Sequence, residues 1–170
     1  MRLVSLASGS DGNSTYIGSE KTHILVDAGI SNKKIETRLN ELGLCGSDIS
    51  GIFLTHEHSD HIAGLEVFVR KNKIPVFASR GTLRYLEDRD KYYSIVDYFH
   101  TVESKKNINL GDLNIKAFDI DHDANEPFGY RVECGNKKIA VATDLGRYTM
   151  DIVNNLSDLD ALLIEANHDI

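Results

Sequence analysis

One short segment of the sequence concentrates side chains that bind metal ions. It reads Thr55-His56-Glu57-His58-Ser59-Asp60-His61 and follows the apolar run Gly51-Ile52-Phe53-Leu54 directly. Neutral imidazole nitrogens and carboxylate oxygens suit Zn²⁺, and also Mn²⁺ or Fe²⁺, so the ligand types alone do not select the metal. The alternative is a polar, histidine-rich turn on the surface. Histidine tracts of this density rarely have another physical purpose, so the segment predicts a metal site.

The position of this segment after a strand lets it serve two ions. An expected strand ends at Leu54, which makes His56 and His58 same-face residues two positions apart in a loop at the sheet edge. Asp60 and His61 can open the following helix, where their side chains point in another direction. One segment therefore predicts parts of two adjacent metal sites.

Two later residues are candidates for the remaining ligands, because each follows an expected strand. His122 comes after Ile115–Ile120, and its alternative is a solvated loop histidine. Asp144 comes after the apolar strand Ile139–Ala142, where its two oxygens could bridge two cations. The alternative for Asp144 is the N-cap of a helix that begins near Tyr148.

Four other residues have weaker signals. His23 lies inside an early strand and His100 at the end of another, so both are interpreted as structural or surface residues. His168 follows a buried strand and is a candidate ligand or substrate contact. Asp27, at the end of its strand, either orients a ligand histidine or serves as a cap or turn residue.

The hydrophobic pattern indicates the elements that position these residues. Expected strands are Leu3–Leu6, Ser14–Ile17, His23–Val26, Ile52–Leu54, Val76–Ala78, Ser94–Phe99, Ile115–Ile120, Phe128–Glu133, Lys138–Ala142 and Ala161–Glu165. Expected helices begin after Ser31 and end at Gly43, run through Leu65–Val69, and cover Thr82–Arg89 and Tyr148–Asn155. An initial meander followed by mixed helices and strands predicts two packed sheets with helices outside.

The turn Ser8–Asn13 is rich in small polar residues that permit backbone close to an anion. Ser8, Ser10 and Asn13 are therefore candidate phosphate contacts. A plain hairpin connection uses the same residue types and remains the alternative.

Composition is that of an ordinary soluble globular protein: 170 residues, 41% hydrophobic and 26% charged, which fits one domain over residues 1–170. The N-terminal apolar run is too short for a signal peptide and no stretch reaches membrane-spanning length, so we expect a cytoplasmic protein. A net charge of −7 argues mildly against a polyanionic partner, but bound cations would reverse the local field. Three basic pairs could hold a nucleic-acid backbone: Lys33 with Lys34, Arg80 with Arg84, and Lys105 with Lys106.

The sequence resembles the metallo-β-lactamase superfamily, whose His-x-His-x-Asp-His motif matches His56–His61. Within it, the chain is similar to the YycJ/WalJ branch, which is grouped with DNA exonucleases. Further matching segments are Ser8–Asn13, Asp27–Gly29, His122–Ala124 followed by Gly129–Arg131, Thr143–Gly146 and Glu165–Asp169. The resemblance extends over all 170 residues.

This resemblance implies an α/β fold, the four-layer αββα metallo-β-lactamase sandwich. It also implies two divalent ions, Zn²⁺ or Mn²⁺. His56, His58 and His122 would hold one ion, Asp60 and His61 the other, and Asp144 would bridge them. The family carries a final histidine for the second ion on a later segment. We therefore expect a chain that is incomplete at its C-terminus and lacks the last part of the second half.

The expected function is metal-dependent hydrolysis, most simply exonuclease cleavage of DNA by a metal-activated hydroxide, with Asp60 and Asp144 as catalytic residues. A second reading is a hydrolase of small thioesters, lactones or cyclic phosphodiesters. The context of His122, Asp-His-Asp-Ala, differs from the Pro-Gly-containing motif of related thioesterases. A third reading is a metal-binding module that is inactive at this chain length. No protein partner can be inferred.

Overall fold

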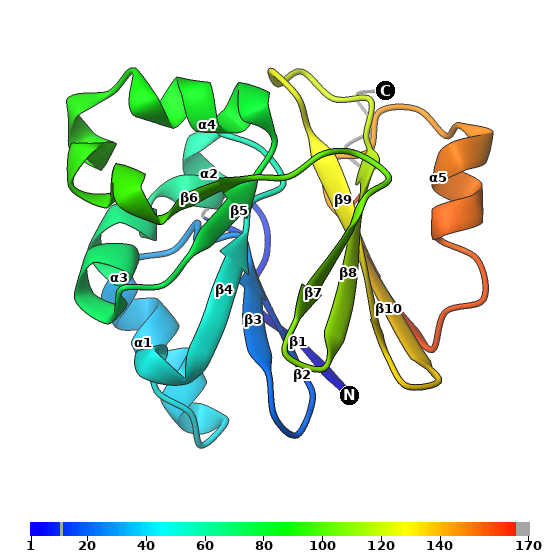
Figure 1. The fold of residues 1–170 in the computed structure, drawn as a ribbon, viewed down its shortest axis with the longest axis horizontal. Helices are drawn as coiled ribbons and strands as arrows, with labels where there is room; N and C mark the ends of the chain where they lie inside the picture. Colours follow the sequence, from blue (N-terminus) through cyan, green and yellow to red (C-terminus); the bar gives the residue numbers. More distant parts are fainter. Residues whose placement is uncertain (11, 166–170) are drawn as a thin grey trace.

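Two β-sheets pack face to face between helices in this structure, a computed structural model that describes residues 1–10 and 12–165 (Figure 1). The first sheet contains β1 (Arg2–Ala7), β2 (Ser14–Gly18), β3 (His23–Val26), β4 (Ile49–Phe53), β5 (Val76–Ala78) and β6 (Phe99–Thr101) in that spatial order. The second contains β11 (Ala161–Ile164), β10 (Lys137–Ala142), β9 (Phe128–Cys134), β8 (Leu113–Asp119) and β7 (Asn107–Leu110). His168 lies outside the described residues.

Helices cover the outer faces of both sheets (Figure 1). They are α1 (Asn32–Glu41), α2 (Ser59–Ile62), α3 (Leu65–Asn72), α4 (Arg80–Glu87) and α5 (Met150–Asn155), with 3₁₀ segments at Gly46–Asp48 and Asp90–Tyr98. The first four lie on the side of the first sheet, whereas α5 lies against the second sheet. This arrangement confirms the expected αββα layers.

Strand pairing explains why the candidate ligands meet at one edge. β1, β2 and β3 form the expected antiparallel meander, whereas β3, β4, β5 and β6 are parallel. Parallel strands end at the same sheet edge, so the residues after Val26 and after Phe53 lie together. Across the sandwich, the Phe128 amide donates to the Thr55 carbonyl at 2.9 Å and the Tyr130 hydroxyl to the Leu54 carbonyl at 2.7 Å. These two bonds tie the second sheet to the loop that follows β4.

Three apolar layers hold the sandwich together. Alternation along β3 sends Leu25 toward α1 and α3, while Ile24 and Val26 face the second sheet. The middle layer brings Phe53 together with side chains of β8, β9 and β10, such as Tyr130. Ile152 of α5 completes the third layer on the outer face of the second sheet. Burial on both faces accounts for the nearly continuous apolar runs of the central strands.

One expected strand is wrong. Most of Ser94–Phe99 belongs to the 3₁₀ segment Asp90–Tyr98, and β6 begins only at Phe99. Tyr92 and Ile95 are both buried, and their spacing of three residues matches one 3₁₀ turn. The aromatic and β-branched composition suggested a strand, but the helical spacing of the buried side chains decides the local structure.

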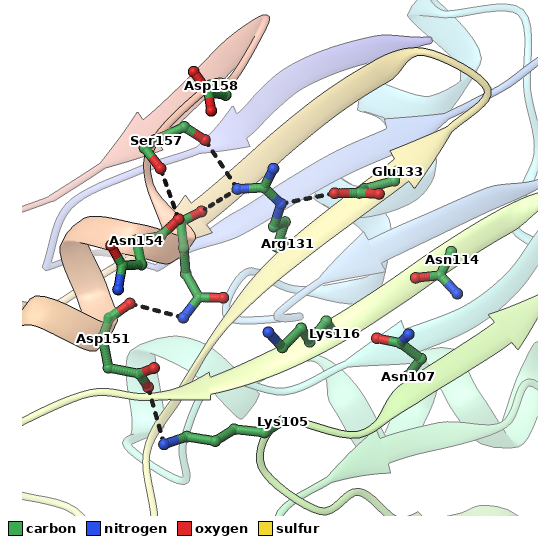
Figure 2. A pocket seen from close by; sticks show the side chains of 11 residues that line it. Lys105, Asn107, Asn114, Lys116, Arg131, Glu133, Asp151, Asn154, Ser157 and Asp158 are labelled. Carbon is green, nitrogen blue, oxygen red and sulfur yellow. Dashed lines mark hydrogen bonds and ion pairs between the residues drawn. The ribbon is translucent and has the colours of Figure 1, made fainter.

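A polar cavity of about 610 Å³ lies between the second sheet and α5 (Figure 2). The Arg131 guanidinium in this cavity is paired: it donates to Glu133 at 2.8 Å and to the carbonyls of Asn155 and Ser157 at 2.9 Å. These bonds fasten the segment after α5 to the sheet. The cavity therefore has a structural explanation and lies apart from the candidate ligands.

No helix in the part of the chain that the structure describes is long and apolar enough to cross a membrane.

Candidate metal centre

The histidine cluster is placed as its spacing predicts. β4 ends at Phe53, and Thr55–His58 form a loop that leads into α2. Asp60 and His61 lie in this short helix, so their side chains approach the sheet edge from a different direction than His56 and His58. The buried side chains of this segment include His56 and His61.

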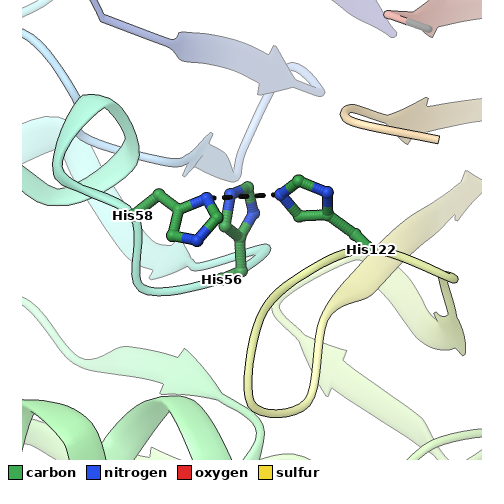
Figure 3. A group of neighbouring side chains, drawn as sticks. All are labelled: His56, His58 and His122. Carbon is green, nitrogen blue, oxygen red and sulfur yellow. Dashed lines mark hydrogen bonds between the residues drawn. The ribbon is translucent and has the colours of Figure 1, made fainter. Parts of the chain in front are cut away.

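Three imidazoles form the first half-site, by which we mean His56, His58 and His122 (Figure 3). One ring nitrogen of each lies within 4.8 Å of the others. His58 Nδ1 and His122 Nε2 are 3.3 Å apart. Residues separated by more than sixty positions are thus brought together by the ends of β4 and β8.

We define the second half-site as Asp60, His61 and Asp144. The second group of donor atoms that all lie within 4.8 Å of one another contains His56, His61 and Asp144. His61 Nε2 lies 3.4 Å from Asp60 Oδ2 and 3.1 Å from Asp144 Oδ2. His56 Nε2 is 3.8 Å from the same Asp144 oxygen, so the two half-sites are adjacent. Asp144 has a left-handed φ of 57°, a conformation that Asp adopts more readily than most residues, just after β10.

The donor atoms fit divalent ions. Two ligands bound at about 2.0–2.1 Å to one tetrahedral ion are roughly 3.3 Å apart. The separations between His58 and His122 and between His61 and the two carboxylates are 3.1–3.4 Å. His56 Nε2 is also buried without a hydrogen-bond partner among the described residues. A buried nitrogen in this state is costly unless an ion or water uses it.

Asp27 orients the second half-site from behind. Its Oδ2 lies 2.8 Å from His61 Nδ1, which leaves Nε2 facing Asp60 and Asp144. This contact matches one of the two roles expected for Asp27 and is typical of carboxylates that fix a ligand histidine. Asp27 has a left-handed φ of 62° and is 1% exposed. The fold therefore holds a strained, buried carboxylate at this position.

Thr55 extends the support to both half-sites, a role that the sequence did not predict. Its backbone amide and hydroxyl each donate to Asp27 at 2.8 Å. The same hydroxyl oxygen lies 3.0 Å from His56 Nδ1 and, because its own proton goes to Asp27, accepts a hydrogen bond from that nitrogen, which leaves His56 Nε2 facing the site. Parallel pairing of β3 and β4 places Asp27 and Thr55 side by side, and this register was the only signal that could have found the pair.

Backbone contacts lock Asp60 in place. The Asn13 amide donates to the Asp60 carbonyl at 2.7 Å, and Gly29 donates to the Asn13 carbonyl at 2.8 Å. A Cβ at Gly29 would overlap the Asp60 carbonyl oxygen, so only glycine fits there. The Asn13 side chain donates to Asp60 Oδ2 at 3.2 Å and also lies 3.1 Å from His61 Nε2. Asn13 thus supports the second half-site.

Glu57, the other carboxylate of the cluster, points away from the ligands. It accepts hydrogen bonds from the Asn125 amide at 2.8 Å, from the Asn125 side chain at 2.6 Å and from Thr82 at 3.1 Å. Asn125 lies three residues after His122, so Glu57 anchors the loop that carries the third imidazole. Sequence alone did not predict this role, because it depends on where that loop folds.

The two half-sites differ in charge. Burial and the nearby charge of His61 lower the pKa of His56 to about 3, and burial also lowers the pKa of His122. Burial disfavours the charged form of His61 as well, but Asp27, Asp144 and Asp60 outweigh it and raise its pKa to about 10. The hydrogen bond from His61 lowers the pKa of Asp144. Without an ion, a proton on His61 therefore neutralises part of the carboxylate charge.

The remaining candidates lie outside both groups. Ser8 and Ser10 are exposed in the turn after β1, and their contact with phosphate stays a prediction. The Tyr16 hydroxyl lies 2.8 Å from His23 Nδ1, and His100 stacks on Phe77 with ring centroids 5.2 Å apart. Neither histidine joins a group of potential ligands in the described ranges.

The fold and this cluster define a metallo-β-lactamase type of protein, and comparison with known proteins agrees. The beta-lactamase superfamily domain model matches residues 22–169, so the chain belongs to that superfamily. It is 40% identical over 167 residues to the exodeoxyribonuclease WalJ of Streptococcus pneumoniae serotype 2 (strain D39), covering 97% of this chain and 62% of that protein. It is 36% identical to the exodeoxyribonuclease YycJ of Bacillus anthracis, with the same coverage. The chain thus spans about 62% of the length of these curated relatives.

Solved structures share the fold at low sequence identity. A metallo-β-lactamase from Cronobacter sakazakii superimposes with a TM-score of 0.74 at 18% identity, covering 92% of this chain and 74% of that one. Zn²⁺-bound PqqB from Methylobacterium extorquens also gives 0.74, at 20% identity, covering 90% of this chain and 59% of that one. At these identities the likeness establishes the fold alone.

Proposed function

We propose that this chain forms the metal-binding part of a phosphodiesterase that acts on DNA as an exonuclease. The observation that carries the proposal is the adjacency of the two half-sites: His56 Nε2 lies 3.8 Å from Asp144 Oδ2, and the His56 and His61 ring centroids are 4.0 Å apart. Relatives called exodeoxyribonucleases, at 40% and 36% identity along 97% of the chain, support DNA as the substrate.

The available donor atoms indicate which residues would hold two divalent ions, Zn²⁺ or Mn²⁺. His56, His58 and His122 would hold one, Asp60 and His61 the other, with Asp144 between them. When bound, such a pair of ions lowers the pKa of a water and stabilises charge on the attacking and leaving oxygens of a phosphodiester. Imidazole and carboxylate donors are compatible with either metal.

The protein's own contribution is to hold these donors ready. Asp27 and Thr55 keep Nδ1 of His61 and of His56 engaged, so both Nε2 atoms face the shared space. Asn13 holds Asp60 through its side-chain amide. Because the supporting groups are buried, the ligand positions need little reorganisation when an ion or substrate arrives.

An assay of the metal-loaded protein tests the proposal. Wild-type protein with Mn²⁺ or Zn²⁺ is incubated with end-labelled single- and double-stranded DNA, and separately with a generic thioester. We expect release of labelled mononucleotides and no thioester cleavage. Thioester cleavage without DNA cleavage would replace the proposal with a small-molecule hydrolase, and absence of both would favour a module inactive at this length.

Asp60→Ala provides the internal control for this assay. Its side chain lies partly exposed beside His61 and outside the apolar core, so the fold should survive its removal while turnover is lost. Circular dichroism verifies the fold of the variant. Nuclease activity that persisted in a folded Asp60→Ala preparation would indicate a contaminant and remove the support for this site.

A further inference from the structure

A cavity of about 680 Å³ lies beside the second half-site. Its walls come from the end of β1, two loops at the sheet edge that contain Gly12 and Ile30, and the first turns of α1 with Lys33 and Lys34. Gly12 precedes Asn13, which contacts Asp60, and Ile30 follows Gly29, which packs on the Asp60 backbone. These loop segments both line the cavity and touch the second half-site.

Among the described residues, all the charged side chains that line this cavity are basic. Lys33, Lys34 and Arg38 line it, and no acidic side chain does so among the described residues. Neither lysine ammonium has an ion-pair partner within the described ranges, whereas Arg38 pairs with Glu41 at 3.0 Å. In a chain of net charge −7, two uncommitted lysines beside a cavity form a local attraction for anions.

These lysines are poorly placed for helix stability. Ser31 is the N-cap of α1, so Lys33 and Lys34 lie in the first turn, which contains no acidic residue. The helix dipole makes positive charge unfavourable at this end. Helix formation therefore gives no reason for the two lysines, and an external anion would supply one.

The other two basic pairs named by the sequence differ from this one. Arg80 pairs with Glu87 at 3.3 Å, although Arg84 has no ion pair among the described residues. Lys105 pairs with Asp151 at 3.4 Å. Lys106 pairs with Glu103. Lys33 and Lys34 thus combine free charge with a position next to the candidate ligands.

We propose that this cavity binds a phosphate of the DNA backbone next to the phosphodiester presented to the half-sites. Lys33 and Lys34 supply point charges, and the Ser8 hydroxyl can donate to a phosphate oxygen. The apolar wall of Leu6, Ala7 and Ile30 suits a sugar or base face. The subsite rests on the proposed nuclease function, and it acts on binding of polymeric substrates rather than on the chemical step.

Direct binding tests the subsite without turnover. The metal-free protein in EDTA is titrated against a fluorescein-labelled thymidine oligonucleotide of about twelve nucleotides, within the usual range of single-strand site sizes. Lys33→Gln with Lys34→Gln is compared with Lys105→Gln with Lys106→Gln, which removes the same two charges elsewhere. We expect Kd to rise about fivefold for the first pair only, and the magnitude of its salt slope to fall by about 0.7, the value for one single-strand phosphate that is no longer neutralised.

Kinetics separate this subsite from the nuclease itself. For the metal-loaded protein, the Lys33–Lys34 variant should raise KM for the oligonucleotide without changing kcat, and should hydrolyse bis(p-nitrophenyl) phosphate like wild type. DNA binding that weakens equally in both double variants, or that weakens in neither, would overturn the subsite. Wild-type protein that cleaves neither substrate would overturn the nuclease proposal, while the binding comparison would still decide the subsite.

Discussion

The two half-sites share the segment His56–His61 yet differ in how firmly the protein holds them. In the second, His61 is fully buried and contacts Asp27, and Asn13 donates to Asp60. In the first, His58 and His122 are only partly buried, and the hydrogen bond that each ring makes within the described residues is to the other. The second half-site is thus rigid and prepared, whereas the first is open toward solvent.

Charge follows the same division. In the first half-site, burial lowers the pKa of His56 and of His122 and so favours their neutral forms. The second combines two carboxylates with an imidazole whose pKa is raised to about 10. A buried group of carboxylates requires a cation, and in the metal-free protein a proton serves. Rigidity is therefore concentrated in the second half-site, where carboxylate charge must be balanced next to a buried imidazole.

Asp144 connects the halves, so its substitution should have the largest effect. Asp144→Asn keeps the shape but removes the charge next to both His56 and His61. We expect DNA hydrolysis to fall by about a thousandfold, the scale of losing a group that stabilises the transition state. Steady-state kinetics measure the loss, with Asp119→Asn, an exposed carboxylate at the end of β8, as the control. A similar decrease in both variants would refute the connecting role.

Asp27→Asn should weaken metal binding mainly at the second half-site. Losing the carboxylate partner of His61 should weaken metal binding there by about 10–100-fold, as is usual for such supporting groups. The first half-site, which Asp27 reaches only through Thr55 and His56, should weaken less. Titration of Zn²⁺ against a competing chelator resolves two affinities in wild type, and equal weakening of both would contradict separate support.

Glu57→Gln is the corresponding substitution for the first half-site. Glu57 accepts from the Asn125 amide and side chain, and so holds the loop carrying His122. Replacing it should cost about 1–3 kcal/mol of stability, the range for a buried hydrogen-bond partner lost. Metal affinity should fall a few-fold at the first half-site alone. Urea unfolding and the same chelator titration measure both, and an unchanged first affinity would show that the loop needs no such anchor.

The number of protons released on metal binding should differ between the two half-sites. Because the pKa of His61 is about 10 in the metal-free protein, filling the second half-site at pH 7.5 should release about one proton from it. Filling the first should release almost none from His56 or His122. Calorimetry in buffers of different ionisation enthalpy counts these protons. Equal release in both steps would contradict the assigned charges.

The same pKa sets a stability window for the metal-free protein. A folded pKa raised above the ordinary value of about 6.5 stabilises the fold fully below pH 6.5. That contribution is lost as pH rises from 6.5 through about 10. Urea unfolding should show this decline without metal and not in the metal-loaded protein, where the ion replaces the proton.

How much the sequence predicted depends on whether a signal is local. His56, His58, Asp60 and His61 were recognisable because their spacing alone carries the chemistry. His122 was found because it follows an expected strand. The supporting roles of Thr55 and Glu57 were not, since they depend on which strands pair and where a distant loop folds.

The prediction of the fold succeeded where the sequence signal is local and was wrong where it depends on tertiary packing. Strands with apolar side chains on both faces, such as β4, have a strong signal that survives without tertiary information. The strand predicted over residues 94–99 was wrong, because burial in this part of the chain follows the three-residue spacing of Tyr92 and Ile95 rather than strand alternation.

Counting bound ions tests the central claim, that two separable half-sites lie side by side, most directly. Wild type, His58→Ala and Asp60→Ala are loaded with Mn²⁺, dialysed, and analysed for metal per folded chain. The account predicts about two ions in wild type and about one in each variant, since each variant spares the opposite half-site. One ion in wild type and none in either variant would mean a single shared site and would contradict it.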